Sequence, residues 1–475
     1  MKKLLVLIAL LGTLVPAAFT IYKAGGFDNW QGVLPKGTTD SLYYYARIKE
    51  VVDGHLLNGN PYVYEYRDTF APAFFIPDIV SAIPMLLGVP FNLGVLLNIF
   101  IWSFVFLLLS FNLFRFLKLP KNWALLWSVI LYISAYSFML RPTIMQLIYP
   151  LFLLFLIVLL KFLEEPFVRK RAIWLALVSA GTFYVYTYLS YIVVLTLAFI
   201  FLWYLCTRRF KELKSLMSVG IFSALFLIPF GVYTWIQIFS PYYFETLTRI
   251  GLTYTRIPTI EAYFYGRWIV IGMVAAWLVP NRHRVFWFGT GLGLLASMLL
   301  NVFTGVELLL GVHIGRFVIL WMAAILGELL YGRHSKRSLF PAILLLALFF
   351  GVARNISRGV DFFWFDNRGE KLADVQVYGA PLKWLDAEVS EESVVWANGF
   401  ISEYIPIMTR HYPVYFHGAA LHNIPTKELE ERRLYPERFN ARYLIIDRNH
   451  DDAKLSSLDK VLYDDGRFAI LALPL

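Results

Sequence analysis

Residues 38–68 read TTDSLYYYARIKEVVDGHLLNGNPYVYEYRD, a polar stretch in a chain that is otherwise mostly apolar. An apolar run, Leu4–Ile21, precedes this stretch, and apolar residues return from Phe70 onward. The ionisable side chains that it gathers include Asp40, Arg47, Glu50, Asp53, His55, Glu65, Arg67 and Asp68. Because functional residues concentrate on loops that a rigid scaffold positions, we look for the chemistry of the protein in this loop first.

The composition is that of a protein that crosses a membrane several times. Of the 475 residues, 59% are hydrophobic and 16% are charged, whereas a soluble domain carries about a quarter charged residues. The net charge of +10 comes from basic residues dispersed at the ends of hydrophobic runs. That is a topology signal and argues against nucleic-acid binding. The single cysteine, Cys206, excludes an internal disulfide and a cysteine-based metal site.

Hydrophobic runs predict about eleven transmembrane helices. The first run, Leu4–Ile21, is long for a signal peptide and lacks a clean small-residue exit, so we favour a retained helix over a cleaved signal. Residues 78–89 are too short to span and are expected at the outer interface. The other runs, of which 171–206 could be divided differently, lie near 92–114, 123–140, 144–163, 171–187, 188–206, 214–238, 267–280, 285–303, 315–332 and 338–354.

The basic residues predict the orientation of these helices. Alternate connections carry basic clusters: Lys2 and Lys3; Arg115, Lys118 and Lys121; Lys161, Arg169, Lys170 and Arg171; Arg208, Arg209, Lys211 and Lys214; Arg282 and Arg284; Arg333, Lys336 and Arg337. The opposite set of short connections holds only Arg141, Arg249, Arg256, Arg267 and Arg316. The first set is therefore cytoplasmic. We expect a prokaryotic plasma-membrane protein with its N-terminus inside and its opening loop and tail outside.

The tail after about Arg354 has the pattern of a small α/β domain. Strands are expected at 394–396, 414–416, 443–446, 460–463 and 468–471, and helices at 380–389 and 426–438. Asp464-Asp465-Gly466 predicts a hairpin turn between the last two strands. We therefore divide the chain into a transmembrane domain, 1–356, with an outer catalytic loop at 23–91, and an extracytoplasmic α/β domain, 357–475.

Asp40 is the main candidate for a catalytic group. It precedes a helix-like run that ends at Gly54, so the alternative role is that of a helix N-cap, and the two roles are compatible. A carboxylate at the membrane face, beside aromatic side chains that can stack on a sugar, suits a general base for a sugar hydroxyl. For Arg47 and Glu50, the simpler interpretation is a surface pair at i and i+3 on this helix.

The loop and its surroundings resemble the GT-C glycosyltransferases, which are polytopic membrane enzymes that use lipid-linked sugars. In that superfamily an early acidic residue of the first outer loop is followed by aromatic residues and a helix. Here Asp40 is followed by Tyr43, Tyr44 and Tyr45. The resemblance extends to the first helix, the short spans and the outward C-terminal domain. It implies a GT-C-like helical membrane fold and an acceptor-activating role for Asp40.

The resemblance also implies fixed cations for a lipid phosphate, because arginine binds phosphate oxygens in a bidentate manner. For the outer arginines the alternative is snorkelling to lipid headgroups. We favour snorkelling for Arg256 and Arg267 and leave both interpretations open for Arg316. The substrate-binding residues that we expect are Tyr44, Arg47, Glu65, Asp68, Glu245, Arg249, His313 and Arg316.

No cofactor is expected, and a divalent metal is an open alternative that we do not favour. The oligosaccharyltransferase branch of the superfamily adds a second acidic pair in a later outer loop to hold a divalent metal. The second outer connection here reads Leu140-Arg141-Pro142-Thr143, without an acid. The tail histidines, His411, His417 and His422, have irregular spacing and no acidic partner at the spacing of a metal site, so we interpret them as core or surface residues.

The sequence favours an inverting glycosyltransferase that moves a hexosyl or pentosyl group from a polyprenyl-phosphate donor to a hydroxyl of a glycan, lipid or protein acceptor. A transporter or flippase would place ionisable residues near the bilayer midplane, often in broken helices. The middles of the predicted spans are almost free of charge. A non-catalytic membrane assembly protein for cell-envelope glycans stays open, because only the first loop argues against it.

Overall fold

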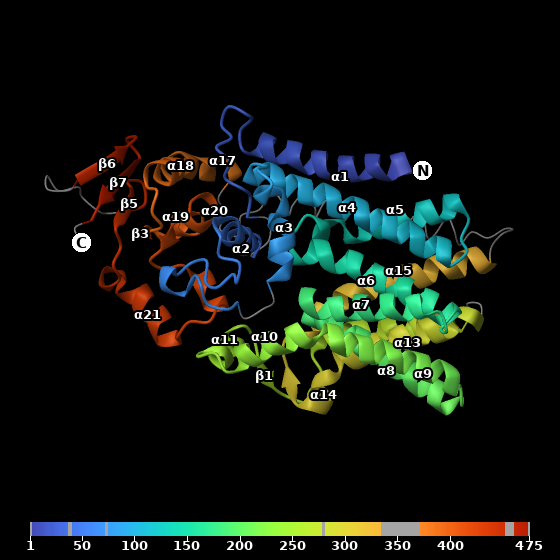
Figure 1. The fold of residues 1–475 in the computed structure, drawn as a ribbon. Helices are drawn as coiled ribbons and strands as arrows, with labels where there is room; N and C mark the ends of the chain where they lie inside the picture. Colours follow the sequence, from blue (N-terminus) through green and yellow to red (C-terminus); the bar gives the residue numbers. More distant parts are fainter. Residues whose placement is uncertain are drawn as a thin grey trace.

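A computed structural model describes residues 2–36, 40–71, 75–277, 281–333, 371–451 and 460–473. Within these residues, long helices form a bundle, and a small α/β domain packs against one end of it (Figure 1). The N-terminus lies at the opposite end of the bundle (Figure 1). Below, these two ends are called the domain end and the far end.

The long helices follow the predicted hydrophobic runs. They are α1 (Lys2–Lys23), α4 (Phe91–Phe116), α5 (Lys121–Met139), α6 (Ile144–Glu164), α7 (Arg169–Val185), α8 (Thr187–Cys206), α9 (Phe210–Phe226), α10 (Ile228–Ile238), α12 (Ile260–Ala276), α13 (Asn281–Met298) and α15 (Leu310–Arg333). The division within 171–206 falls at Tyr186, whose extended backbone separates α7 from α8.

Six of the described helices are long and apolar enough to cross a membrane, and the bent pair α9–α10 would make a seventh. The pair bends by 53° where Pro229 stands in the first turn of α10, because proline cannot donate the hydrogen bond that would continue the preceding helix. The protein is therefore a multi-pass membrane protein. The predicted total of about eleven spans stays a prediction, and the run at 338–354 lies outside the described residues.

Shorter elements connect the long helices. They are α2 (Ser41–Asp53), the 3₁₀ turn η1 (Tyr64–Tyr66), α3 (Ile76–Leu86), α11 (Tyr243–Arg249), α14 (Leu300–Thr304) and the strands β1 (Thr253–Tyr254) and β2 (Val306–Glu307). As predicted, Gly54 ends α2 in a left-handed conformation with φ of 109°. The short apolar helix α3 occupies the segment that was predicted not to span.

The α/β domain contains one five-stranded sheet. Its strands are β3 (Val394–Trp396), β4 (Tyr412–Pro413), β5 (Tyr443–Asp447), β6 (Lys460–Asp464) and β7 (Phe468–Ala472), in the order β4-β3-β5-β7-β6. Strand β3 is parallel to both β4 and β5, and β7 is antiparallel to β5 and β6. The predicted hairpin turn at Asp464-Asp465-Gly466 is confirmed, whereas β4 lies two residues before its predicted position.

The domain also contains helical segments. They are α17 (Leu372–Val375), η2 (Gln376–Tyr378), α18 (Gly379–Glu388), α19 (Gly399–Ser402), α20 (Ile405–Met408), η3 (His417–Leu421), α21 (Thr426–Leu434) and η4 (Pro436–Arg438). The segments α18 and α21 match the two helices that the sequence predicts. Figure 1 shows the whole domain lying beyond α2 and α3, at the domain end.

The buried apolar side chains form two cores. One lies among the long helices, and the other joins the opening loop to the α/β domain. In the second core, Val33 and Tyr45 of the loop region share contacts with a group that includes Leu382 and Ile470. The loop and the domain therefore pack as one body, and the predicted domain boundary at 356–357 lies outside the described residues.

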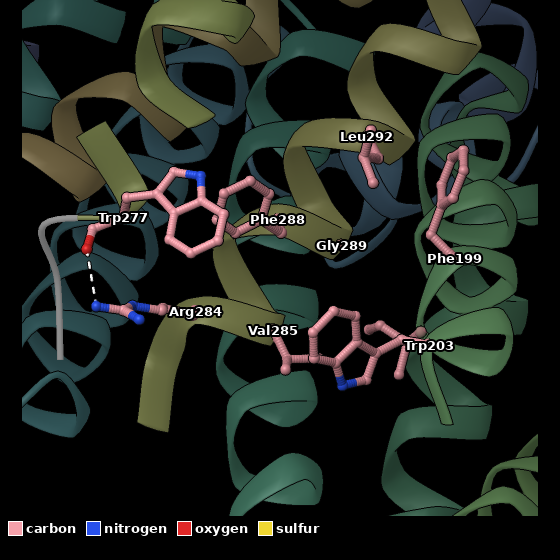
Figure 2. A pocket seen from close by; sticks show the side chains of 9 residues that line it. Phe199, Trp203, Trp277, Arg284, Val285, Phe288, Gly289 and Leu292 are labelled. Carbon is pink, nitrogen blue, oxygen red and sulfur yellow. Dashed lines mark hydrogen bonds between the residues drawn. The ribbon is translucent and has the colours of Figure 1, made fainter. Parts of the chain in front are cut away.

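A cavity of about 340 Å³ lies between α8 and α13 (Figure 2). Phe199 and Trp203 of α8 line it, together with Phe288 of α13 and Trp277, which follows α12. Arg284 closes one side by donating a hydrogen bond of 2.9 Å from Nη2 to the carbonyl oxygen of Trp277. The wall is almost wholly apolar and lies toward the far end of α8, so this cavity is separate from the polar loop.

Candidate active site

Asp40 stands immediately before α2, and its side chain is directed at the bundle. Its carboxylate forms an ion pair with Nη2 of Arg141, which lies in the turn between α5 and α6. The side chain makes no capping hydrogen bond to the backbone of α2. The capping interaction considered from the sequence is therefore wrong, because the carboxylate is turned toward a guanidinium group of a distant turn.

Arg141 is the site residue that the sequence did not reveal. The residue is 8% exposed, its Nη2 lies 3.5 Å from the Tyr44 hydroxyl, and its guanidinium carbon lies 5.2 Å from the centre of the Tyr44 ring. Burial raises the pKa of Tyr44 to about 12, so this hydroxyl stays protonated at neutral pH. The only available signal was a single arginine in an otherwise uncharged connection.

Arg316 lies over the same turn. Its Nη1 is 3.5 Å from Sδ of Met145, and its guanidinium carbon is 5.9 Å from the ring centre of Phe138. These two contact residues belong to α6 and α5 and flank Arg141 in the sequence. Among the described residues Arg316 has no carboxylate partner, so a half-buried cation lies beside the Asp40–Arg141 pair.

His313 is placed one helical turn before Arg316 on α15. Its Nδ1 is hydrogen-bonded to the hydroxyl of Tyr186, and its ring stacks on Tyr188 with centres 4.1 Å apart. The charges of both Arg141 and Arg316 act on His313 and on Tyr186. Asp40, Tyr44, His313 and Arg316, all predicted from the sequence, thus gather around Arg141.

Several buried polar atoms beside these groups have no hydrogen-bond partner among the described residues. They are Nε of Arg141, Oγ1 of Thr143, Oε1 of Gln146 and the hydroxyl of Tyr149. Buried polar groups in folded proteins are nearly always hydrogen-bonded to protein or to ordered water. The turn between α5 and α6 therefore offers donors and acceptors that a ligand can use.

Other predicted residues lie elsewhere. Glu65 forms an ion pair of 2.7 Å with Arg432 of α21, and Asp68 lies 2.8 Å from Nδ1 of His55. The other ring nitrogen of His55 lies 2.9 Å from Glu392 of the α/β domain. These contacts join the second half of the opening loop to the domain, so the structure does not bring Glu65 or Asp68 to Asp40.

Arg249 and Glu245 also bind the α/β domain. Arg249 donates to the carbonyl oxygens of Ala420 and His422, each at 3.0 Å, and to the hydroxyl of Thr426 at 2.8 Å. Glu245 accepts a 2.5 Å hydrogen bond from the backbone N–H of Thr426. The helix α11 is thereby attached to the domain, and the donors of Arg249 are directed at protein oxygens.

Arg47 and Glu50 do not form the surface pair that their spacing suggested. Both are buried, at 1% and 4% exposed, and Arg47 is paired with Asp78 of α3 through two hydrogen bonds of 3.1 and 2.5 Å. Glu50 accepts a hydrogen bond of 3.3 Å from the hydroxyl of Tyr412. The surface interpretation is wrong because α3 and the α/β domain cover this side of α2.

No group of three or more His, Cys, Asp and Glu side chains within the described ranges is arranged to hold a metal ion. Two of the three tail histidines, His411 and His422, lie in the core, at 1% and 0% exposed. Independence from metal stays a prediction about activity.

Comparison with known proteins identifies the fold. No family model matches the sequence, and no curated protein matches it. Solved structures do match, and two of them are of ArnT from Cupriavidus metallidurans. The apo form is 13% identical with a TM-score of 0.52, and the form bound to undecaprenyl phosphate is 12% identical with a TM-score of 0.53. Each match covers 98% of this chain and 97% of ArnT. The predicted fold class is confirmed, and the chain has the fold of ArnT.

Proposed function

We propose that this protein is a membrane glycosyltransferase that moves a sugar from a polyprenyl-phosphate donor to an acceptor hydroxyl. The observation that carries the proposal is the Asp40–Arg141 pair beside Arg316, a guanidinium with no carboxylate partner among the described residues, at the domain end of a bundle with the ArnT fold. Support also comes from the matched ArnT structure with bound undecaprenyl phosphate, because a lipid of this kind would carry its phosphate to a membrane surface.

In this proposal Arg141 and Arg316 hold the donor phosphate. Both guanidinium groups lie at the same turn, and arginine is the side chain best suited to bidentate contact with phosphate oxygens. The sequence suggested Arg249 for part of this role. We assign it to Arg141 instead, since Arg249 already donates to three groups of the α/β domain.

Asp40 acts as the general base. The acceptor oxygen attacks the anomeric carbon, and the bond from that carbon to the phosphate oxygen breaks on the opposite side, which inverts the configuration. The acceptor proton passes to a carboxylate oxygen of Asp40. The polyprenyl phosphate leaves as an anion that needs no general acid. A bound phosphate competes with Asp40 for Arg141, and that competition frees a carboxylate oxygen to accept the proton.

The described part of the bundle has one deeply buried carboxylate, and its surroundings give little support to a transporter function. Glu328 of α15 is 3% exposed. It is engaged by Nδ1 of His283 and, at 2.7 Å, by Nε1 of Trp287. Its position near the far end of α15, with two partners, is that of a group that joins α13 to α15.

The direct test is to incubate the purified protein with labelled polyprenyl-phosphate hexoses and pentoses, together with a cell-envelope extract that supplies acceptor hydroxyls, and to follow release of polyprenyl phosphate. One donor of the series should be consumed. In parallel, binding of undecaprenyl phosphate should weaken by roughly tenfold or more in Arg316→Gln and in Arg141→Gln, because each loses charge-assisted hydrogen bonds to phosphate. The matched control is Arg267→Gln, since Arg267 is exposed and stacks on Phe264. Equal binding by all variants would exclude a phosphate site at Arg141 and Arg316.

A further inference from the structure

A second group of polar side chains lies beside the Asp40–Arg141 pair. It consists of Tyr43, Arg47, Tyr62, Asp78 and His422 and is called the polar cluster below. Arg47 connects its members, because it donates to the Tyr43 hydroxyl at 3.0 Å and is paired with Asp78. The rings of Tyr43 and His422 have centres 5.4 Å apart, and the Tyr62 hydroxyl lies within electrostatic range of Tyr43 and Arg47.

The polar cluster contains unused hydrogen-bonding atoms. Tyr62, His422 and Asp78 are between 0% and 1% exposed. Within the described residues, the Tyr62 hydroxyl, Oδ1 of Asp78 and both ring nitrogens of His422 have no hydrogen-bond partner. The backbone of Gly59 lies near the His422 ring but without normal hydrogen-bond geometry. So many unpaired buried atoms in one place indicate that a further group forms hydrogen bonds with them.

The charge of the polar cluster indicates what that group is. Arg47 and Asp78 neutralise each other. Burial, and then the charge of Arg47, hold the pKa of His422 well below its usual value, so its ring is neutral and offers one donor and one acceptor. Burial also raises the pKa of Tyr62 well above its usual value, so its hydroxyl keeps its proton. Neutral donors and acceptors beside aromatic rings suit an uncharged group with many hydroxyls.

The polar cluster is adjacent to the proposed phosphate site. The ring of Tyr43 packs edge-on against Tyr44 with centres 5.2 Å apart, and Tyr44 contacts Arg141. The Tyr43 ring thus lies between His422 and Tyr44, the residue that faces Arg141. We propose that the polar cluster binds the sugar of the lipid-linked donor while Arg141 and Arg316 hold its phosphate. This inference rests on the proposed function and gives the α/β domain, through His422, a part in donor recognition.

Tyr62→Phe is the sharpest variant, because it removes one unpaired hydroxyl and keeps the ring that packs on Phe416 at 5.0 Å. Its melting temperature should equal or exceed that of the unaltered protein, since a buried unpaired hydroxyl is lost. Binding of undecaprenyl phosphate should not change. Binding of the undecaprenyl-phosphate sugar that the protein consumes should weaken by roughly tenfold, the loss of about one hydrogen bond. The control is Tyr45→Phe, since Tyr45 is buried like Tyr62 but belongs to α2 and lines a separate cavity of about 450 Å³.

The outcomes separate the two proposals. If Tyr62→Phe binds both lipids as the unaltered protein does, or weakens both equally, ordered water satisfies the polar cluster and the sugar site is excluded, while the proposed function stands. A lower melting temperature than that of Tyr45→Phe would likewise show a packing role for the hydroxyl and overturn the sugar site. If the unaltered protein binds neither lipid, the proposed function fails and the sugar site fails with it.

Discussion

Arg141 reaches the carboxylate of Asp40 across 101 positions of sequence. The ion pair joins the start of α2 to the turn between α5 and α6, so the position of Asp40 depends on the assembly of the bundle as well as on its own loop. No feature of the sequence around Asp40 predicts that Arg141 is its partner. The pairing also gives Asp40 a defined orientation before any substrate arrives, and it places the carboxylate within reach of whatever binds Arg141.

Asp40→Asn should lower turnover by roughly a hundredfold or more, because an amide cannot accept the acceptor proton. Binding of undecaprenyl phosphate should be retained or tightened, since Arg141 is released from its carboxylate. Transfer rate and lipid binding are measured on the same preparation. The control is Asp53→Asn, which removes a carboxylate from the same helix, where it pairs with Lys49. An Asp40→Asn variant that keeps most of its activity would rule out Asp40 as the base.

Arg249→Gln should loosen the attachment of α11 to the α/β domain. Hydrogen bonds that involve a charged group contribute about 1.5–3 kcal/mol each, so the melting temperature should fall and proteolysis of the domain should become faster. Affinity for undecaprenyl phosphate should stay the same. Arg256→Gln is the comparison, because Arg256 donates to the carbonyl oxygens of Val302 and Phe303 and not to the domain. If Arg249→Gln weakens lipid binding and Arg256→Gln does not, Arg249 contributes to the phosphate site.

Glu50 should make the stability of the protein depend on pH. Burial raises its pKa from the usual 4.5 to about 8. Between these two values the folded protein holds a proton that the unfolded chain has released, so stability falls as pH rises from about 4.5 to about 8 and then levels off. Glu50→Gln stays neutral and should melt at a higher temperature than the unaltered protein at pH 8.5, with a smaller difference at pH 5. Equal slopes of melting temperature against pH would contradict this, and Glu388→Gln, at an exposed position at the end of α18, serves as the control.

Activity should persist in excess chelator, because no described cluster of acids and histidines is arranged to hold a metal ion. The experiment compares turnover before and after treatment with EDTA. Loss of activity that returns with manganese or magnesium would contradict the expectation and point to a metal bound through Glu65, Asp68 or Glu245.

Reporter fusions test the orientation that the basic residues predict. Fusions after Lys36, Ser240 and Asn449 should report the outer side, and fusions after Arg208 and Lys336 the cytoplasmic side. The opening loop and the α/β domain pack together, so Lys36 and Asn449 must report the same side. A cytoplasmic signal at Asn449 would remove the reason for placing the reaction outside.

The sequence was sufficient for the parts of the fold that depend on local patterns. Hydrophobic runs predicted the long helices, and β-branched and aromatic clusters predicted the strands of the domain within about two residues. The partners of buried charges could not be predicted in this way. Arg47 pairs with Asp78, and Glu65 pairs with Arg432, because α3 and the α/β domain cover the opening loop. Such contacts depend on how distant segments pack, and one sequence carries no local signal of that packing.

The core shared by the opening loop and the α/β domain has a consequence for biosynthesis. Val33, Leu42 and Tyr45 are made early, whereas Leu382 and Ile470, which complete the same core, are made after nearly the whole bundle. During translation the apolar residues of the loop therefore stay uncovered until more than three hundred further residues have been made. If translation stops before the last strand, the product has inserted helices and an incomplete core at the loop. Quality-control proteases that recognise exposed apolar segments would then bind it.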